Sequence, residues 1–442
     1  MGEPGRILVR CLGVCDGTIS VAGDRTHHAA ALFEQTPQGL HVIACGAASD
    51  VEAHPEAGIA RTIDCTDSVV LPGLINAHTH LDLTVIGPLP HEPRDGFASW
   101  VSKIRSARPT EPAAIEASVA AGVAMSRAGG VVAVGDIAGA VRGSASLLSA
   151  RALQSSGMAG VSFIEFFAIG PTERERANAA IELVHASHSE LCGRHRLGLQ
   201  PHATNTVSEA AFETAVRAAG ELGVPLMTHL AESPEEQRLV AEASGPQRAL
   251  LEDLGLWNAS VENEFGRGVT PIAKLAPVLR GSRTAAVHVN QCDDADLKLL
   301  IESNLPVVYC PRASSYFGAE HHFGPHRYRE MIDAGITVAI GTDSIVNLPQ
   351  NSEHISPLDD LRFLFRRDGI DASTLLRMAT TSAASVLRMD RDSASFVPSS
   401  RPLGVIAIPV AEHDIPNPAA SALRSESAPQ WVLEAATEVP RE

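Results

Sequence analysis

The sequence lacks the long hydrophobic runs and the excess of basic residues that mark several large classes of protein. No stretch of its 442 residues approaches the roughly 20 uninterrupted apolar residues that a membrane-spanning helix requires. Lysine and arginine together number 35 against 52 aspartates and glutamates, which gives a formal net charge of −17. Because such an acidic chain repels both nucleic acid and anionic lipid, we expect neither nucleic acid nor a membrane as a partner.

Closely spaced cysteine pairs are also lacking. The seven cysteines are scattered along the chain and include no Cys-x-x-Cys pair. An odd number without such spacing fits reduced thiols better than a disulfide framework. The N-terminal residues 1–6 do not show the basic-then-apolar order of a secretory signal. We therefore expect a cytoplasmic protein.

The pattern of apolar residues divides the chain into two kinds of segment. The first 70 residues contain short β-like runs, such as Ile7–Cys11 and His41–Cys45, separated by Gly, Pro and Asp, and they predict a small antiparallel sheet. From residue 68 onward, short apolar runs alternate with Ala-, Leu- and Glu-rich segments of helical period. This alternation is typical of repeated βα units.

Eight apolar runs follow one another in this second part. They are Val69–Ala77, Val131–Ile137, Val161–Ile169, Leu197–His202, Pro225–Leu230, Thr284–Val289, Pro306–Pro311 and Ile336–Thr342. The predicted helices include Glu209–Leu222, Pro234–Leu254, Ala295–Ser303, His326–Ala334 and Ala372–Met389. Eight parallel strands with helices between them close naturally into a barrel.

We therefore predict an α/β protein with a (β/α)8 TIM-type barrel over residues 68–390. A small β-sandwich domain is expected from residues 1–67 and 391–442, with Leu403–Val410 adding a strand to the N-terminal sheet. We expect little regular structure in the final part of the tail.

Polar residues gather at the ends of the predicted strands. Strand one ends in Asn-Ala-His78-Thr-His80, and His229, His288 and Asp343 stand in or just after strands five, six and eight. In a TIM barrel these carboxyl ends meet on one face. Two histidines at positions i and i+2 of an extended segment point to the same side, so His78 and His80 can bind one ion together.

His229 and Asp343 would complete a set of three nitrogens and one oxygen. Such a set suits one Zn²⁺ per chain, and also Fe²⁺, with an open position for a water that then titrates near neutrality. Glu232 is close enough to His229 to carry a proton, and His288 can orient the water or stabilise developing charge. Alone, His288 would more often be an interior histidine and Asp343 a turn residue. Together, these polar side chains after apolar runs indicate a metal site, because unpaired charge is costly to bury.

Four motifs carry a family resemblance. LPGLINAHTHLDL, MTHLAES, AVHVN and IGTDS, in this order, resemble the cytosine/guanine deaminase and chlorohydrolase branch of the amidohydrolase superfamily, over about residues 65–390. The resemblance implies a single Zn or Fe, a proton shuttle and an assisting histidine, which fall on His78, His80, His229 and Asp343, on Glu232, and on His288. Relatives with two metals use a carbamylated lysine after strand four. In this chain residues 197–202 read LGLQPH and contain no lysine, so we expect a single metal ion. The sequence itself gives no oligomeric state, and the resemblance allows a homodimer, because many relatives form dimers.

Four further residues are expected to contact substrate. Arg312 and Tyr316 lie in a loop that should overhang the pocket, although a surface salt bridge is an equal alternative for Arg312. His202 resembles the substrate-side histidine of these deaminases, but its segment reads Pro-His-Ala-Thr-Asn where Pro-His-Ala-Pro-Tyr is usual. Trp100 lies with Arg94 in a loop that resembles a lid, although a tryptophan more often serves packing. By contrast, His321, His322 and His326 are expected to face solvent or the rim.

The predicted function is a metal-dependent hydrolase of carbon–nitrogen bonds that are not peptide bonds. The segment CPRASSYFG, residues 310–318, is similar to the strand-seven loop of aminodeoxyfutalosine deaminase-like proteins, whose close relatives deaminate S-adenosylhomocysteine and methylthioadenosine. This favours deamination of an adenine-nucleoside-like or related N-heterocyclic small molecule. Hydrolytic removal of chloride or an alkylamine from a triazine-like ring stays open, because the difference between the reactions lies in the pocket and not in the metal ligands. A noncatalytic barrel homologue is the third alternative.

Overall fold

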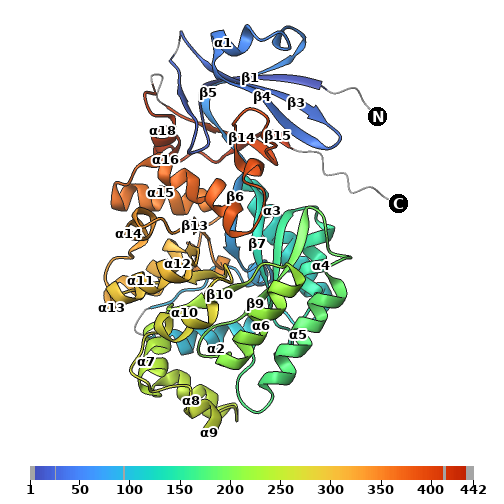
Figure 1. The fold of residues 1–442 in the computed structure, drawn as a ribbon. Coiled ribbons are helices and arrows are strands. Elements are labelled where there is room, and N and C mark those ends of the chain that lie inside the picture. Colours follow the sequence, from blue (N-terminus) through green and yellow to red (C-terminus); the bar gives the residue numbers. More distant parts are fainter. Residues whose placement is uncertain (1–4, 25, 93–94, 412–414, 435–442) are drawn as a thin grey trace. The chain divides into compact units, whose positions relative to one another are not determined.

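The computed structural model describes residues 5–24, 26–92, 95–411 and 415–434 (Figure 1). Contacts within the chain define two compact units. The first unit comprises Met1–Ala77, Ala124–Val134 and Glu353–Glu442, and the second comprises His78–Val123 and Gly135–Ser352. The fold is α/β, with a sheet-rich N-terminal part and parallel sheets in the remainder. None of the helices in the described part of the chain has both the length and the apolar character that a bilayer span needs.

The first unit contains a seven-stranded sheet. Its order is β15-β14-β5-β1-β3-β4, with β2 paired to β1. The strands are β1 (Gly5–Cys15), β2 (Ser20–Ala22), β3 (Ala29–Thr36), β4 (Gly39–Ala47), β5 (Arg61–Pro72), β14 (Gly404–Pro409) and β15 (Gln430–Glu434). The prediction of an antiparallel sheet is wrong for one pair, because β1 and β5 run parallel. The predicted tail strand is confirmed, since β14 pairs antiparallel with β5.

The tail is more regular than the sequence indicated. After β14, Pro418–Arg424 form helix α18, and β15 pairs with β14. The side chain of Asn417 caps α18 by accepting a hydrogen bond from the Ala420 amide, at 3.0 Å. Six apolar or small residues of this short helix, including Leu423, are buried, and this burial orders a segment whose composition suggested a loop.

Helices of the first unit cover both predicted and unexpected segments. They are α1 (Ala48–Glu52), η1 (Ala57–Ile59), α15 (Pro357–Asp368), α16 (Ala372–Met378), α17 (Thr381–Val386) and η5 (Arg391–Ala394). The single helix predicted over Ala372–Met389 is therefore two. Thr380, with φ −125° and ψ −107°, interrupts it, and its hydroxyl donates to the Leu376 and Asp16 carbonyls at 2.9 and 3.0 Å. A hydroxyl that bonds to backbone in this way competes with helix continuation.

Two four-stranded sheets contain the eight strands that the sequence predicts. The first has the order β6 (Leu74–Thr79), β7 (Val131–Ala138), β8 (Ala159–Phe166), β9 (His195–Pro201), and the second β10 (Met227–Leu230), β11 (Ala285–His288), β12 (Val307–Tyr309), β13 (Val338–Ile340). Neighbouring strands of the second sheet run parallel, as do β8 and β9. Isolated parallel bridges also join Leu199 to Leu226 and Thr79 to Asp343.

The predicted run Val69–Ala77 belongs to two strands instead of one. The break falls at Gly73, whose amide donates to the Gly404 carbonyl at 2.8 Å. A Cβ at Gly73 would lie 2.1 Å from Val132 Cγ1, so only glycine fits there without a shift of its neighbours. Because the residues on both sides are apolar, their pattern did not indicate the break.

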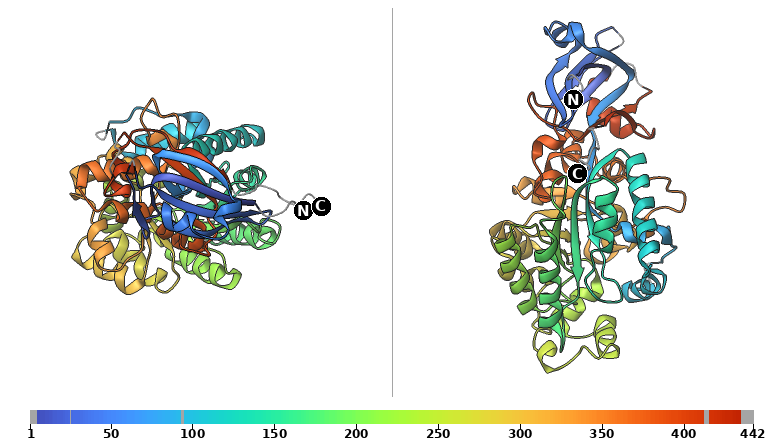
Figure 2. Two further views of the ribbon diagram at one scale, coloured as in Figure 1. Left: turned by 90° about the horizontal axis from the view of Figure 1, so that it is seen from above. Right: turned by 90° about the vertical axis from the view of Figure 1, so that its right-hand side faces the viewer.

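Helices connect the strands of the second unit. They are η2 (Leu81–Ile86), α2 (Phe97–Ala107), α4 (Leu148–Ser155), α5 (Glu173–Ser187), α6 (Glu209–Leu222), α7 (Pro234–Glu242), α8 (Pro246–Asp253), α9 (Ala259–Glu262), α10 (Pro271–Leu279), α11 (Asp294–Ser303), α12 (Pro311–Tyr316), α13 (Ala319–Phe323), α14 (Tyr328–Asp333) and η4 (Ile345–Asn347), and α3 (Pro112–Ala128) continues into the first unit. Helices α5 and α6 lie side by side (Figures 1 and 2). The predicted helix Pro234–Leu254 is split into α7 and α8, because Ala243 adopts a left-handed conformation with φ 51°.

Candidate metal centre

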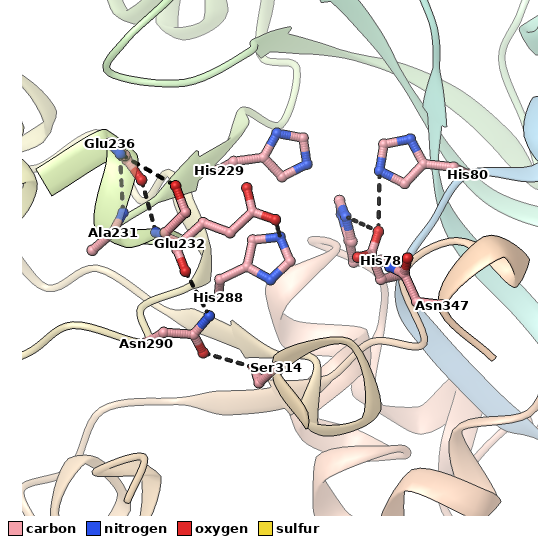
Figure 3. Close-up of polar contacts among 12 residues, drawn as sticks. His78, His80, His229, Ala231, Glu232, Glu236, His288, Asn290, Ser314 and Asn347 are labelled. Atoms are coloured by element: carbon pink, nitrogen blue, oxygen red, sulfur yellow. Dashed lines mark hydrogen bonds and ion pairs between the residues drawn. The ribbon is translucent and has the colours of Figure 1, made fainter. Parts of the chain in front are cut away.

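Three imidazoles meet where strands β6 and β10 end. His78 lies in β6, His80 follows it, and His229 lies in β10. Each offers a ring nitrogen, and these nitrogens lie within 4.8 Å of one another. The centroid of the His78 ring is 5.0 Å from that of His80 and 5.2 Å from that of His229. The structure thus brings together three of the four predicted ligands across about 150 residues of sequence (Figure 3).

The hydrogen bonds of these histidines leave nitrogens available for a cation. His229 Nδ1 lies 3.1 Å from the His202 carbonyl oxygen, which can only accept a hydrogen bond. Nδ1 therefore holds the proton, and Nε2 keeps the lone pair that a metal ion would bind. His78 Nε2 is buried and finds no hydrogen-bond partner among the described residues. Buried polar atoms without partners are rare in folded proteins, and a metal ion would satisfy them. The residues therefore fit a bound ion.

Burial also keeps these imidazoles uncharged. It lowers the pKa of His78 and of His229 to about 3, and it lowers the pKa of His80 well below its usual value, with the neighbouring histidines adding to the shift. A neutral imidazole keeps the lone pair that a metal binds. The site is thus in the protonation state that ligation requires.

Asp343 supplies the predicted carboxylate. Its Oδ1 lies 3.4 Å from His80 Nε2 and 3.7 Å from His78 Nε2. Its Oδ2 accepts a hydrogen bond from Asn347 Nδ2 at 2.7 Å, and its backbone is left-handed, with φ 57°. The Asp343 amide donates to the His78 carbonyl at 3.1 Å. Backbone and side chain together hold the carboxylate against the imidazoles.

Glu232 and His288 complete a second group of possible ligands. Their ligand atoms and that of Asp343 lie within 4.8 Å of one another, and Glu232 Oε1 is 3.5 Å from His288 Nε2. Burial, and then the charge of Asp343, raises the pKa of Glu232 well above its usual value. A carboxyl with a raised pKa can exchange protons near neutral pH, which is what a proton carrier beside a reacting water must do.

The backbone of Glu232 is held on both sides. Its amide donates to Glu236 Oε2 at 2.7 Å, and its carbonyl accepts from Asn290 Nδ2 at 3.0 Å. Asn290 Oδ1 in turn accepts from Ser314 Oγ at 2.7 Å (Figure 3). Glu236 also accepts a hydrogen bond from the hydroxyl of Thr204. Sequence reasoning missed this network, and the only signal for it was the threonine in Pro-His-Ala-Thr-Asn, which departs from the usual proline.

Of the four residues expected to contact substrate, His202 lies at the cluster. Its ring centroid is 5.0 Å from that of His229, and its Nδ1 is 2.7 Å from Thr206 Oγ1. Burial lowers the pKa of His202 to about 3, so it is a neutral hydrogen-bonding group. A role toward substrate stays a prediction.

The other three belong to helices α2 and α12. Trp100 packs edge-on against Phe317, with ring centroids 5.1 Å apart, and Tyr316 packs against the same phenylalanine at 5.0 Å. The Tyr316 hydroxyl donates to the Leu89 carbonyl at 3.0 Å. Arg312, half-buried, stands near the start of α12. Their substrate contacts stay predictions, and Arg94 lies outside the described residues.

One expectation about histidines is wrong. His321 and His322 are exposed, as predicted, but His326 is buried, with only 7% of its surface accessible. Its Nε2 lies 2.8 Å from the His288 carbonyl oxygen. The polar, glycine-flanked segment around it indicated a surface loop, but aromatic neighbours, described below, bury the ring.

A buried ion-pair network was also missed. Arg108 donates from Nε and Nη2 to Asp82 Oδ2, at 3.0 and 2.7 Å, and its Nη1 is 3.5 Å from Glu165 Oε2. Nearby, burial raises the pKa of Asp136 to about 7. Asp136 and Glu165 are single acids inside the apolar runs of β7 and β8, and that was the signal in the sequence.

Known proteins resemble this chain in sequence and in fold. Residues 69–397 match the model of the amidohydrolase family, so the chain belongs to that family, as predicted. It is 25% identical over 346 residues to a 5-methylthioadenosine/S-adenosylhomocysteine deaminase of Haloarcula marismortui, covering 74% of this chain and 70% of the relative. It is 26% identical over 348 residues to an aminodeoxyfutalosine deaminase of Deinococcus radiodurans, covering 72% and 73%. An adenosine deaminase of Xanthomonas campestris, solved with bound zinc, shares the fold, with a TM-score of 0.71, 19% identity and 97% and 91% coverage.

If the three imidazoles hold one ion, removing one of them should abolish tight binding. We expect the purified chain, incubated with zinc and then desalted, to keep about one ion per chain, and His80→Ala to keep at least about tenfold less, as loss of one of four ligands implies. His321→Ala, on the exposed helix α13, serves as the control and should match the parent. Metal analysis by mass spectrometry reads the result. Equal zinc retention in the parent and in His80→Ala would remove His80 from the site.

Proposed function

We propose that this chain is a zinc-dependent aminohydrolase that releases ammonia from an adenine-nucleoside-like or related N-heterocyclic small molecule. The observation that carries the proposal is the half-buried carboxyl of Glu232, with its raised pKa, beside three uncharged imidazoles and Asp343. That combination suits hydrolysis with proton transfer to a leaving amine. The deaminase names of the relatives support the choice of amine over chloride as the leaving group.

The residues would divide the work as follows. His78, His80, His229 and Asp343 would hold the ion, which when bound makes water nucleophilic near neutral pH. Glu232 would take a proton from the attacking water and give it to the departing nitrogen, because its raised pKa lets it hold a proton between the two events. His288, 3.5 Å from Glu232, would orient the attacking water or stabilise the charge that develops on oxygen and nitrogen as the attacked carbon becomes tetrahedral.

The fold supports a closed barrel for this chemistry. The bridges Leu199–Leu226 and Thr79–Asp343 lie between the two four-stranded sheets, one at each side, and closure through both would give eight parallel strands in a ring. We propose that this barrel spans residues 68–390, and that residues 1–67 and 391–442 form the small β domain. The pairing of β14 with β5 supports the second part.

The substrate class can be tested with the zinc-loaded protein and a panel of 6-aminopurine nucleosides. Adenosine, methylthioadenosine, S-adenosylhomocysteine and aminodeoxyfutalosine should include at least one compound that releases ammonia with a kcat of about 1 per second or more. Ammonia is measured with a coupled assay, and loss of the 6-amino group is confirmed by mass spectrometry. Atrazine, assayed for chloride, is the comparison substrate. Turnover of atrazine with silence on every nucleoside would contradict the proposal.

The role of Glu232 can be separated from metal binding. Glu232→Gln keeps the shape of the side chain but cannot carry the proton, so we expect kcat to fall by about 10²- to 10⁴-fold while zinc content stays unchanged. Glu242→Gln, an exposed position on helix α7, is the matched control and should keep full activity. Near-normal kcat in Glu232→Gln would exclude it as the proton carrier.

A further inference from the structure

His288 stands on a backbone segment that is unfavourable for its residues. His288 and Val289 are both left-handed, with φ 74° and 54°. Non-glycine residues rarely adopt this conformation, and a β-branched valine does so least readily. The direction of the His288 imidazole, whose Nε2 faces Glu232, depends on this segment. Something must therefore hold the backbone there.

Two backbone amides that follow His288 donate hydrogen bonds to carbonyls at the end of β10. The Val289 amide donates to the Leu230 carbonyl at 2.9 Å, and the Gln291 amide donates to the Ala231 carbonyl at 3.1 Å. Both bonds extend the pairing of β11 with β10. The Val289 amide and the His288 carbonyl belong to one planar peptide group, so the Leu230 carbonyl holds only the N–H end of that peptide and leaves its carbonyl end to another partner.

His326 binds that carbonyl. Its Nδ1 accepts a hydrogen bond from the Tyr328 amide at 3.0 Å, so Nδ1 carries no proton. Nε2 therefore holds the proton and donates it to the His288 oxygen at 2.8 Å. Because both ring nitrogens are engaged, the tautomer and the orientation of His326 are determined by the structure.

Aromatic packing holds the His326 ring in place. It stacks on the ring of Tyr309, with centroids 3.7 Å apart and planes inclined by 18°, and Tyr309 is fully buried in β12. Tyr328 packs on Tyr309 from α14, at 5.4 Å. The donor is thus built into the protein interior and is not a mobile surface side chain.

We propose that His326 is a positioning residue, which holds the left-handed backbone at His288 and so directs the His288 imidazole toward Glu232. The proposal rests on the proposed function only for its kinetic readout. If His326 served only to pack against Tyr309, any flat ring would suffice at this position. If it positions His288, an N–H that donates to the His288 carbonyl is required. The two explanations therefore differ in which substitutions the site tolerates.

Two substitutions separate the donor from the ring. His326→Gln can keep an amide N–H for the His288 carbonyl and an oxygen for the Tyr328 amide, but it loses the stack. His326→Phe keeps the stack on Tyr309 but has no donor. His326→Met is a second donor-free variant that serves if the phenylalanine variant does not fold. His322→Phe, on exposed α13, is the surface control.

The kinetic readout is the division of the effect between kcat and KM. We expect His326→Phe to lower kcat about tenfold or more with KM within about twofold, since loss of one hydrogen bond at a buried group costs roughly that factor. His326→Gln should stay within about threefold of the parent kcat. Wild-type kcat in His326→Phe, or an equal loss in both variants, would overturn the proposal.

Amide hydrogen exchange gives a readout that needs no substrate. Peptides that cover residues 285–292 should exchange about tenfold faster in His326→Phe than in the zinc-loaded parent, and at the parent rate in His326→Gln. Unchanged exchange in His326→Phe would overturn the proposal by itself. If the parent deaminates none of the nucleosides, the proposed function fails, and the exchange rates alone then decide on His326.

Discussion

The site depends on one constraint, which is that the imidazoles of His78, His80 and His229 lie together with ring nitrogens within 4.8 Å of one another. Burial holds them neutral, and the neutral ring offers a lone pair. His78 Nε2 has no hydrogen-bond partner among the described residues, although it is out of contact with water. A protein interior does not tolerate such atoms without compensation, so the arrangement of the surrounding strands makes sense when a cation joins them.

The strand ends around this centre share a second property. Ala231, His288, Val289 and Asp343 all adopt left-handed backbone conformations, and they follow or end β10, β11 and β13. At each of these residues the chain changes direction beside a polar side chain of the site. Backbone of this kind persists only where neighbours hold it. Glu236 accepts from the Ala231 amide at 3.2 Å, His326 donates to the His288 carbonyl at 2.8 Å, and the Asp343 amide donates to the His78 carbonyl at 3.1 Å. The placement of the side chains at the centre therefore depends on the groups around them as much as on the ligands themselves.

The sequence located the strands, and the structure brings the six residues predicted for the site near one another, because each lies in or shortly after an apolar run. The helix Glu209–Leu222 was predicted with the bounds that the structure shows, since Ser208 and Gly223 cap its ends. Breaks inside uniform segments could not be seen. Gly73 divides two apolar strands, Ala243 ends α7 and Thr380 precedes α17, and none of these breaks shows in the pattern of apolar residues.

Contacts between distant segments were the other feature that could not be predicted from the sequence. His326 was expected at the rim because its flanking residues are polar, whereas Tyr309 and Tyr328 bury it. The pairing of Arg108 with Asp82 and Glu165 joins three separate segments and follows no spacing rule. Periodicity reports which face of an element is buried, but it does not report which elements meet.

The central claim is that histidine nitrogens from β6 and β10 share one ion, and X-ray absorption of the zinc-loaded chain tests it most directly. The account predicts a first shell of nitrogen and oxygen at about 2.0–2.1 Å with the multiple-scattering pattern of about three imidazoles. A shell dominated by sulfur, or one of oxygen without imidazole scattering, would contradict it.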